Sequence, residues 1–258
     1  MVKLPKRNSI KLMTTGIQVR NMPTEVSVSL IDDAYSEILE PSFGPDELDT
    51  LDTLLDGLAK SEVWGLCAVD GEMPVGCVLG YPFPQSNVLL IGYLTIKPGL
   101  RGGGIGAKLM DEAQQRWFGK DGLTLVVAEV EDPRRHPAVG DVDPKRRAQF
   151  YARRGAQVVV GPYFQPRLEG AGKKRVYDLF LTILGGNAEA ITRENSVRAE
   201  QLTNFILEYF RDSGEGSDFP RADDQEGKDL LAWYRARETV ALHPIGDYAQ
   251  IEIPRINC

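Results

Sequence analysis

The sequence has no run of about 20 apolar residues, the length that a helix needs to cross a bilayer. It has three cysteines, Cys67, Cys77 and Cys258, whose spacing fits neither a zinc site nor a disulfide framework. Positive charge is also scarce, because 37 acidic residues outnumber 30 basic ones and leave a net charge of −7. Such a chain is a poor partner for a nucleic-acid backbone. The basic first residues lack the apolar core of a secretion signal. We therefore expect a cytoplasmic protein without a resident metal, with no membrane or nucleic-acid partner.

What the sequence does contain is a succession of helix and strand patterns. Apolar spacing predicts two helices, over residues 28–39 and 46–60. Further along the chain the same patterns predict strands at 63–71, 73–83, 88–97 and 123–130, helices at 105–117 and 144–154, and a hairpin at 156–164 and 174–184. After residue 186 the composition changes. Two amphipathic helices are expected at 195–211 and 222–239, with a last short strand at 248–253.

The most informative stretch is residues 95–117, TIKPGLRGGGIGAKLMDEAQQRW. A strand runs into a glycine cluster, and a helix leaves from it. Glycine allows a ligand to approach the backbone closely, and the N–H groups and dipole of a helix start attract an anion. Arg101 adds a full positive charge. The stretch therefore predicts a loop that binds phosphate.

Two interpretations of this loop are open. The first is a dinucleotide fingerprint, GGGIGA from Gly102, with Glu129 as the acid that binds ribose. The intervening KPGLR and the hairpin spacing of the preceding strands disfavour it. The second begins at Arg101 and reads Arg-x-x-Gly-x-Gly. This string resembles the signature with which the GNAT superfamily of N-acetyltransferases holds the pyrophosphate of acyl-coenzyme A.

The resemblance continues beyond the loop. YLTIKPGLRGGGIGAKLM is similar to the fourth strand, loop and third helix of that family, and RAQFYARRGAQVVV to its fourth helix and sixth strand. It implies an α/β fold whose mixed sheet splays apart between the fourth and fifth strands. The matching order of elements places this domain at residues 16–185. A loose arm, 1–15, precedes it, and a small, mainly helical extension, 186–258, follows.

The resemblance also implies a function. The protein would transfer an acetyl group from acetyl-coenzyme A to a primary amine by direct attack in a ternary complex. The alternative is a non-catalytic sensor of acyl-coenzyme A, or a module of the same fold that supports a partner. The coenzyme would be bound by the backbone of the fourth strand, by the loop and by a tyrosine of the fourth helix: Leu94, Thr95, Ile96, Arg101, Gly102, Gly103, Gly104, Ile105, Gly106, Ala107 and Tyr151. The start of that helix departs from the family, because Pro144 stands near the place of an asparagine that binds pantetheine and Arg147 replaces a small residue. We expect Arg146 or Arg147 to reach the coenzyme phosphates instead.

Transfer to an amine needs an acid and a base. Tyr151 matches the tyrosine with which the family protonates the departing coenzyme A. The glutamate that some members carry early on the fourth strand is missing, because Val88 stands there. Glu129 and Glu131 alternate on the fifth strand and therefore face the same side, which makes them the candidate bases. His136 is the nearby imidazole.

The acceptor is less defined. The polar face of residues 46–60 carries four aspartates, which could steer a cationic amine or simply be solvated: Asp46, Asp49, Asp52 and Asp56. Tyr163, Phe164 and Arg167 could form the wall of an acceptor pocket or pack within the final hairpin. The extension could cover the acceptor site, form a homodimer contact or pack on the sheet.

Overall fold

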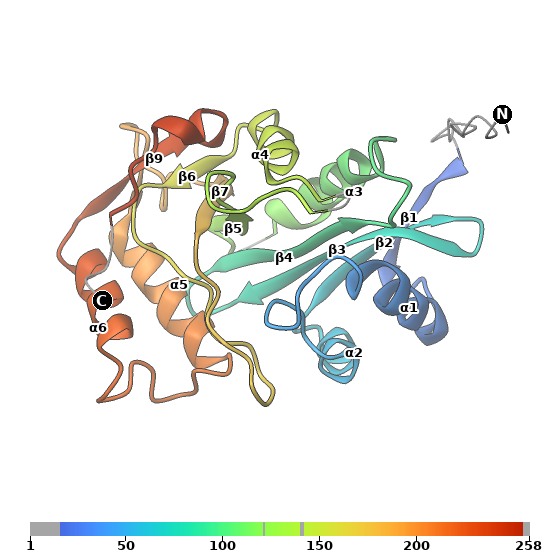
Figure 1. Cartoon of the computed structure of the whole chain (residues 1–258), viewed down its shortest axis with the longest axis horizontal. Helices are drawn as coiled ribbons and strands as arrows, with labels where there is room; N and C mark the ends of the chain where they lie inside the picture. Colours follow the sequence, from blue (N-terminus) through green and yellow to red (C-terminus); the bar gives the residue numbers. More distant parts are fainter. Residues whose placement is uncertain (1–15, 121, 140–141, 255–258) are drawn as a thin grey trace, which may run out of the picture.

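The computed structural model describes residues 16–120, 122–139 and 142–254, so the predicted arm at 1–15 lies outside the described residues. Its centre is a nine-stranded sheet in the order β1-β2-β3-β4-β5-β7-β6-β9-β8 (Figure 1). The strands are β1 Gln18–Met22, β2 Trp64–Asp70, β3 Met73–Phe83, β4 Val88–Ile96, β5 Leu125–Glu131, β6 Gln157–Val159, β7 Leu179–Gly186, β8 Ser196–Arg198 and β9 Thr239–Pro244. The helices are α1 Val28–Ala34, α2 Leu51–Lys60, α3 Ile105–Ala113, α4 Pro144–Ala152, α5 Ala199–Arg211 and α6 Gln225–Arg235.

The sheet is mixed, as the sequence predicts. Strands β1 to β4 are antiparallel neighbours, β4 and β5 are parallel, and β5, β7, β6, β9 and β8 are again antiparallel. The hairpins before the glycine cluster differ from the βαβ units of a dinucleotide-binding fold. The first interpretation of the loop is therefore wrong.

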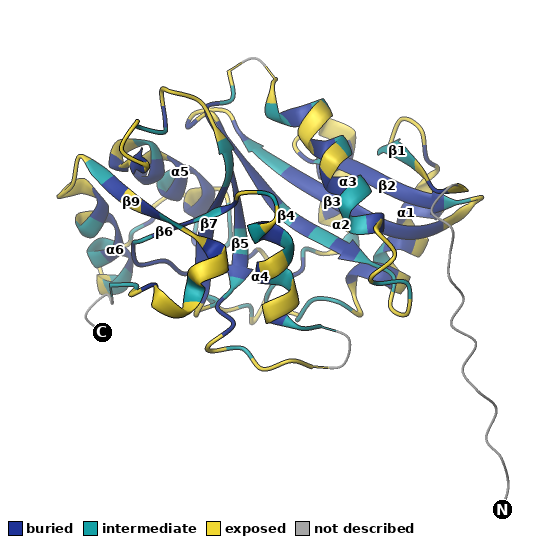
Figure 2. Cartoon of the chain, turned by 90° about the horizontal axis from the view of Figure 1, so that it is seen from above, coloured by how far each residue is buried: buried dark blue, intermediate teal, exposed yellow. Residues whose placement is uncertain are grey.

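Alternate residues of the strands face opposite layers, as the pleat requires. Leu66 and Ala68 of β2 pack under α3, whereas Cys67 and Val69 join the core below α1 and α2. Figure 2 shows the central strands as a mostly buried layer next to partly exposed helices. The free thiols of Cys67 and Cys77 are buried, which agrees with a packing role.

The C-terminal segment continues the same sheet. Its two helices appear where the sequence predicts them, and both pack against the core that contains β5 and β7. The strand predicted at 248–253 is wrong, because residues 245–250 form a 3₁₀ helix. The strand is β9, in which buried Val240 and Leu242 alternate with exposed Ala241. The strand forms at these residues because β9 pairs with β6, which buries one face of β9.

The sheet splits between β4 and β5. Their pairing starts at Val88 with Leu125 and ends at Ile91 with Ala128. On the other edge of β4, Leu79 pairs with Tyr93 and Gly80 pairs with Ile91. Gly92 is thus an extra residue, a bulge that bends the strand away from β5. A Cβ at Gly92 would lie 2.8 Å from the Tyr81 ring, so the bulge requires glycine.

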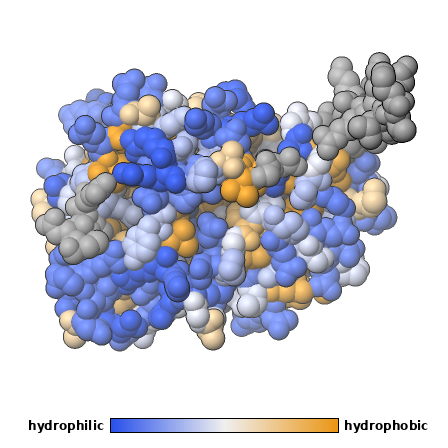
Figure 3. Space-filling model, viewed as in Figure 1, coloured by the Kyte–Doolittle hydropathy of each residue, from blue (hydrophilic) through white to orange (hydrophobic). Residues whose placement is uncertain are grey.

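The molecular surface indicates the position of a functional site less clearly than the split between β4 and β5 does. Figure 3 shows a largely hydrophilic face on which apolar side chains form small separate groups. Within the described ranges, no helix has the length and apolar character needed to span a membrane. Assembly as a homodimer remains a prediction.

Candidate active site

Two cavities lie beside the split. The first, which we call the loop cavity, has a volume of about 630 Å³ and lies between the end of β4, the glycine loop and α4. The second, which we call the acidic cavity, has a volume of about 810 Å³ and lies between β4, β5, the segment before α2, and α5. Arg147 of α4 lines both. A molecule laid in the split would therefore reach from one cavity to the other.

The loop cavity contains most of the residues that the sequence assigns to the coenzyme: Leu94, Thr95, Ile96, Arg101, Gly102, Gly104, Gly106, Ala107, Arg147 and Tyr151. Gly102 and Gly104 have φ angles of 87° and 85°, a region that favours glycine. Gly104 is the N-cap of α3, so the first N–H groups of this helix start at the loop. The side chain of Ile105 is buried in the core below α3, which leaves its backbone N–H as the group that the prediction concerns. Gly103 does not line the cavity.

The charge of the loop cavity suits an anion. Arg101, Arg146, Arg147, Arg153 and Arg154 line it, and the acidic side chain among the lining residues is Asp143. Arg101 is held at the end of β4, where Nε donates to the Ile96 carbonyl oxygen at 3.4 Å and a terminal nitrogen donates to Ser42 Oγ at 3.2 Å. The guanidinium is thereby placed beside the glycine loop.

Tyr151 reaches the loop cavity from α4. The helix starts as the sequence predicts, with Asp143 as an N-cap that accepts from the Lys145 N–H and with Pro144 as the first helical residue. Gly155, at a φ of 74°, follows its end. Tyr151 is 5% exposed, and burial raises its pKa, although the nearby charges of Arg147 and Arg154 lower it. The phenol therefore stays protonated at neutral pH and can donate a proton.

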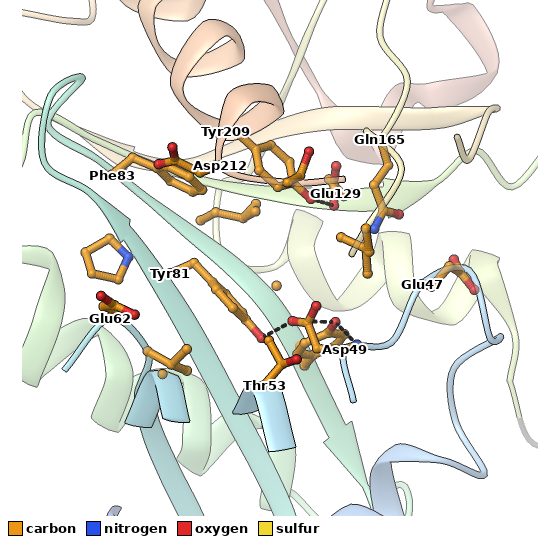
Figure 4. Close-up of a pocket in the computed structure, with 18 of the residues that line it drawn as sticks. Glu47, Asp49, Thr53, Glu62, Tyr81, Phe83, Glu129, Gln165, Tyr209 and Asp212 are labelled. Atoms are coloured by element: carbon orange, nitrogen blue, oxygen red, sulfur yellow. Dashed lines mark hydrogen bonds between the residues drawn. The ribbon is translucent and has the colours of Figure 1, made fainter. Parts of the chain in front are cut away.

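The acidic cavity has the opposite charge. Among its lining residues, all within the described ranges, Arg147 is the positively charged one. Eight carboxylates line it: Glu47, Asp49, Asp56, Glu62, Glu129, Glu131, Glu169 and Asp212. Figure 4 shows several of them around the open space of the cavity. In the part of the chain that the structure describes, His, Cys, Asp and Glu form no group of three that could hold a metal ion.

Glu129 is the buried carboxylate of this cavity. Burial raises its pKa to about 7, and the charge of Glu47 adds to the increase. The hydroxyl of Tyr163 donates to Oε1 at 2.7 Å and that of Tyr209 to Oε2 at 3.5 Å, and both bonds lower the pKa. A carboxyl group that titrates near neutral pH is suited to accept a proton during catalysis.

Glu131 faces the same cavity, as the alternation on β5 predicts, but it has cationic neighbours. A terminal nitrogen of Arg147 lies 3.4 Å from Oε2, and Nδ1 of His136 lies 4.0 Å from Oε1. His136 itself lines neither cavity. Among the described residues, Glu129 has hydroxyl partners and no ion pair. The structure therefore distinguishes the two candidate bases, which the sequence does not.

The three residues of the final hairpin that the sequence offers as an acceptor wall do not line the acidic cavity. Tyr163 binds the carboxylate of Glu129, Phe164 is buried in the core, and the guanidinium of Arg167 donates to the Gly214 carbonyl oxygen. The lining residues from this segment are Gln165, Leu168 and Glu169. Tyr209 and Asp212 of the C-terminal segment also line the acidic cavity, and nothing in their spacing indicated this role.

Comparison with known proteins agrees with this geometry. Residues 31–155 match the sequence pattern of the acetyltransferase (GNAT) family. Among solved structures, a GNAT-family acetyltransferase from Bacteroides thetaiotaomicron shares 20% identity, with 75% of this chain and 98% of that chain covered at a TM-score of 0.53. NAA60 from Arabidopsis thaliana, in complex with a bisubstrate analogue, shares 16% identity, with 66% and 99% covered at a TM-score of 0.47. No curated protein matches the sequence significantly.

A mixed sheet that splits beside a glycine loop is the arrangement that the resemblance to the acetyltransferase family implies. Residues 31–155 therefore belong to a domain of the GNAT acetyltransferase family, and the likeness to the solved structure shows the same fold. At the level of the family, its chemistry is acyl transfer from a coenzyme A thioester.

Proposed function

We propose that the protein is an N-acetyltransferase that moves an acetyl group from acetyl-coenzyme A to a cationic primary amine by direct attack in a ternary complex. The observation that supports this most is the meeting of two oppositely charged cavities at the split between β4 and β5. One suits a polyanionic coenzyme and the other a cationic acceptor.

The loop cavity fits coenzyme A by the chemistry of its lining. The first N–H groups of α3 and the Arg101 guanidinium are donors for a pyrophosphate. Beyond Ile91 the edge of β4 that faces β5 is released from strand pairing. The backbone of Leu94, Thr95 and Ile96 can therefore bind an extended pantetheine as an added strand would. A backbone N–H at this edge would also stabilise negative charge on the thioester oxygen.

The residues on the two sides account for both proton transfers. The acceptor enters as an ammonium, and the carboxylate of Glu129 takes its proton, directly or through a water. The freed nitrogen forms a bond with the thioester carbon, and the bond between that carbon and sulfur breaks. The hydroxyl of Tyr151 gives a proton to the departing thiolate, and the nitrogen gives its second proton to the resulting phenolate, directly or through a water. Glu129 releases the first proton to solvent. The products are an amide and free coenzyme A.

The acceptor class follows from the acidic cavity. Six of its eight carboxylates remain if the pairs of Glu131 with Arg147 and of Asp56 with Lys60 are set aside. The cavity is large enough for a small molecule. A cation is attracted to such a cavity, and its low-dielectric walls strengthen the attraction.

The test is thiol release from acetyl-coenzyme A across a panel of primary amines, with alcohols of the same length as controls. We expect turnover with amines only, and we expect Glu129→Gln to lower kcat about 10²- to 10⁴-fold with coenzyme affinity retained. A protein that binds coenzyme A tightly but acetylates no amine would be a sensor instead, and the proposal would be wrong.

A further inference from the structure

The acidic cavity contains a second carboxylate site opposite Glu129. Asp49 lies in the segment before α2, and the hydroxyls of Tyr81 and Tyr93 lie 2.8 Å and 3.4 Å from its Oδ2. The backbone N–H of Asp49 donates to the Tyr93 hydroxyl at 3.0 Å, and the Tyr35 hydroxyl donates to the Asp49 carbonyl oxygen at 2.9 Å. These contacts fix the position of the carboxylate. Both tyrosines approach Oδ2, which leaves Oδ1 as the oxygen for a ligand.

Aromatic rings surround this carboxylate. The rings of Tyr81 and Tyr93 meet edge to face at 6.0 Å between centroids, and Phe43 meets Tyr93 at 5.0 Å. Burial raises the pKa of Tyr81 and of Tyr93 well above the usual range, so both phenols stay neutral. Aromatic faces next to a carboxylate attract an organic cation through both charge and the ring quadrupole. Tyr81, Tyr93 and Phe43 all line the acidic cavity.

Asp49 makes no ion pair within the described residues, and the ammonium of the nearby Lys173 donates to the Leu48 carbonyl oxygen instead. Asp56, on the same side of the cavity, pairs with Lys60 at 2.6 Å, and Glu131 pairs with Arg147 at 3.4 Å. Asp49 has only neutral hydroxyl partners. A carboxylate oriented by neutral donors toward a cavity stays available to a charged ligand.

Asp49 and Glu129 face the cavity from different walls. Figure 4 shows Asp49 with Tyr81 on one side of the space, and Glu129 with Tyr209 on the other. Glu129 is on β5 next to the split. The carboxylate of Asp49 is instead bonded by the hydroxyls of Tyr81 on β3 and Tyr93 on β4. The two carboxylates can therefore bind two separate groups of one ligand.

We infer that the acceptor carries two amino groups: one that loses its proton to Glu129 and is acetylated, and one that stays an ammonium ion bound by Asp49 within the rings of Phe43, Tyr81 and Tyr93. The inference rests on the proposed function, because it deepens the assignment of the same cavity. Its substrate class is the linear diamines and longer chains that present a diamine end.

Binding can be tested separately from turnover. The protein saturated with free coenzyme A is titrated calorimetrically with α,ω-diamines of three to eight carbons and with the monoamines of equal length. We expect one diamine length to bind about tenfold more tightly than its monoamine. Asp49→Asn should remove this advantage while monoamine affinity changes less than about twofold. The matched control is Asp52→Asn, on the exposed face of α2 and outside the cavity, which should change neither affinity.

Each other outcome has a definite meaning. Equal affinity for diamines and monoamines, no binding of either series, or an equal loss of both in Asp49→Asn would overturn the diamine site. If diamines bind with the expected dependence on Asp49 but no amine is acetylated, the site stands and the transferase proposal fails. If monoamines and diamines are acetylated alike and without regard to Asp49, the transferase stands and the diamine site fails.

Discussion

The hydroxyl of Tyr163 donates a hydrogen bond of 2.7 Å to Oε1 of Glu129. This contact joins the final hairpin to β5 in the wall of the acidic cavity. It stabilises the charged form of a carboxylate that burial would otherwise keep protonated. The groups that act on Glu129 come from three segments: Tyr163 from the hairpin, Tyr209 from α5, and Glu47 from the segment before α2.

Tyr163→Phe should therefore move the acidic limb of the pH profile of kcat/KM. The wild-type limb is expected near pH 7, because the base works only when Glu129 is ionised and its pKa is about 7. Loss of the hydroxyl removes a bond that lowers this pKa, so the limb should shift to higher pH. Tyr177→Phe, whose hydroxyl contacts Glu226 instead, is the control and should leave the limb in place. An unchanged limb in Tyr163→Phe would argue against Glu129 as the base.

Glu129 should also make the fold less stable as the pH rises. Its pKa of about 7 in the folded protein lies above the ordinary 4.5, so between these values the folded state holds more protons than the unfolded state. Stability must then fall with rising pH in this window, by about 3 kcal/mol in total. Urea denaturation at pH 5 and pH 8 measures the unfolding free energy at the two ends of this window. From pH 5 to pH 8, the unfolding free energy of Glu129→Gln should rise by about 2–3 kcal/mol relative to that of the wild type. Glu238→Gln, at an exposed position, should show no such gain.

Tyr151→Phe should lower kcat about 10²- to 10⁴-fold while coenzyme affinity changes little. The reason is that the phenol acts on the departing thiolate and not on the phosphates. Steady-state kinetics and calorimetric titration with coenzyme A separate the two effects. A variant with normal kcat would show that the thiolate gains its proton from another donor.

Arg101→Ala should weaken coenzyme A binding about 10- to 100-fold, the effect expected for loss of a charged hydrogen-bond donor to phosphate. The effect should shrink at high salt, because the interaction is electrostatic. Arg237→Ala, which removes a guanidinium stacked on Trp233 far along the chain, should bind coenzyme normally. Equal affinity in both variants would contradict the assignment of the loop.

Arg175 ties the C-terminal segment to the acetyltransferase domain. Its guanidinium bonds with Glu215 at 2.8 Å, Asp224 at 2.6 Å and Glu226 at 2.9 Å, and the Arg175 side chain is 15% exposed. Arg175→Ala leaves these acids without their cation and should cost about 3–5 kcal/mol of unfolding free energy. Arg221→Ala, in a more exposed pair at 3.8 Å with Asp223, should cost at most about 1 kcal/mol. Chemical denaturation of both variants provides the comparison.

Much of the domain could be predicted from local sequence. The Asp143-Pro144 start of α4 depends on side-chain capping and a fixed φ angle, which are properties of neighbouring residues. The glycine loop needs positive φ at Gly102 and Gly104, and only glycine adopts this easily. The strands before it show their period directly. The order of the elements and the glycine loop follow from such short-range patterns, and the mixed sheet follows from the family resemblance that they carry.

The active-site wall could not be predicted in this way. Asp49 belongs to a face that looks like the solvated side of a helix, yet the tyrosines of β3 and β4 turn its carboxylate into the cavity. Tyr163 and Tyr209 are 46 residues apart in the sequence and meet at one carboxylate. Contacts between residues so far apart in the sequence cannot be predicted from the spacing of neighbouring residues.

The sequence by itself determined the order of the elements, the glycine loop and the pair of candidate bases, because each depends on periodicity, capping or backbone freedom within a few residues. The fold family followed from the resemblance that these motifs carry. Only the tertiary structure decided which carboxylate is buried with a pKa raised to about 7, and which carboxylates line the acidic cavity. Burial, dielectric and charge pairing are set by segments that come together from distant parts of the chain.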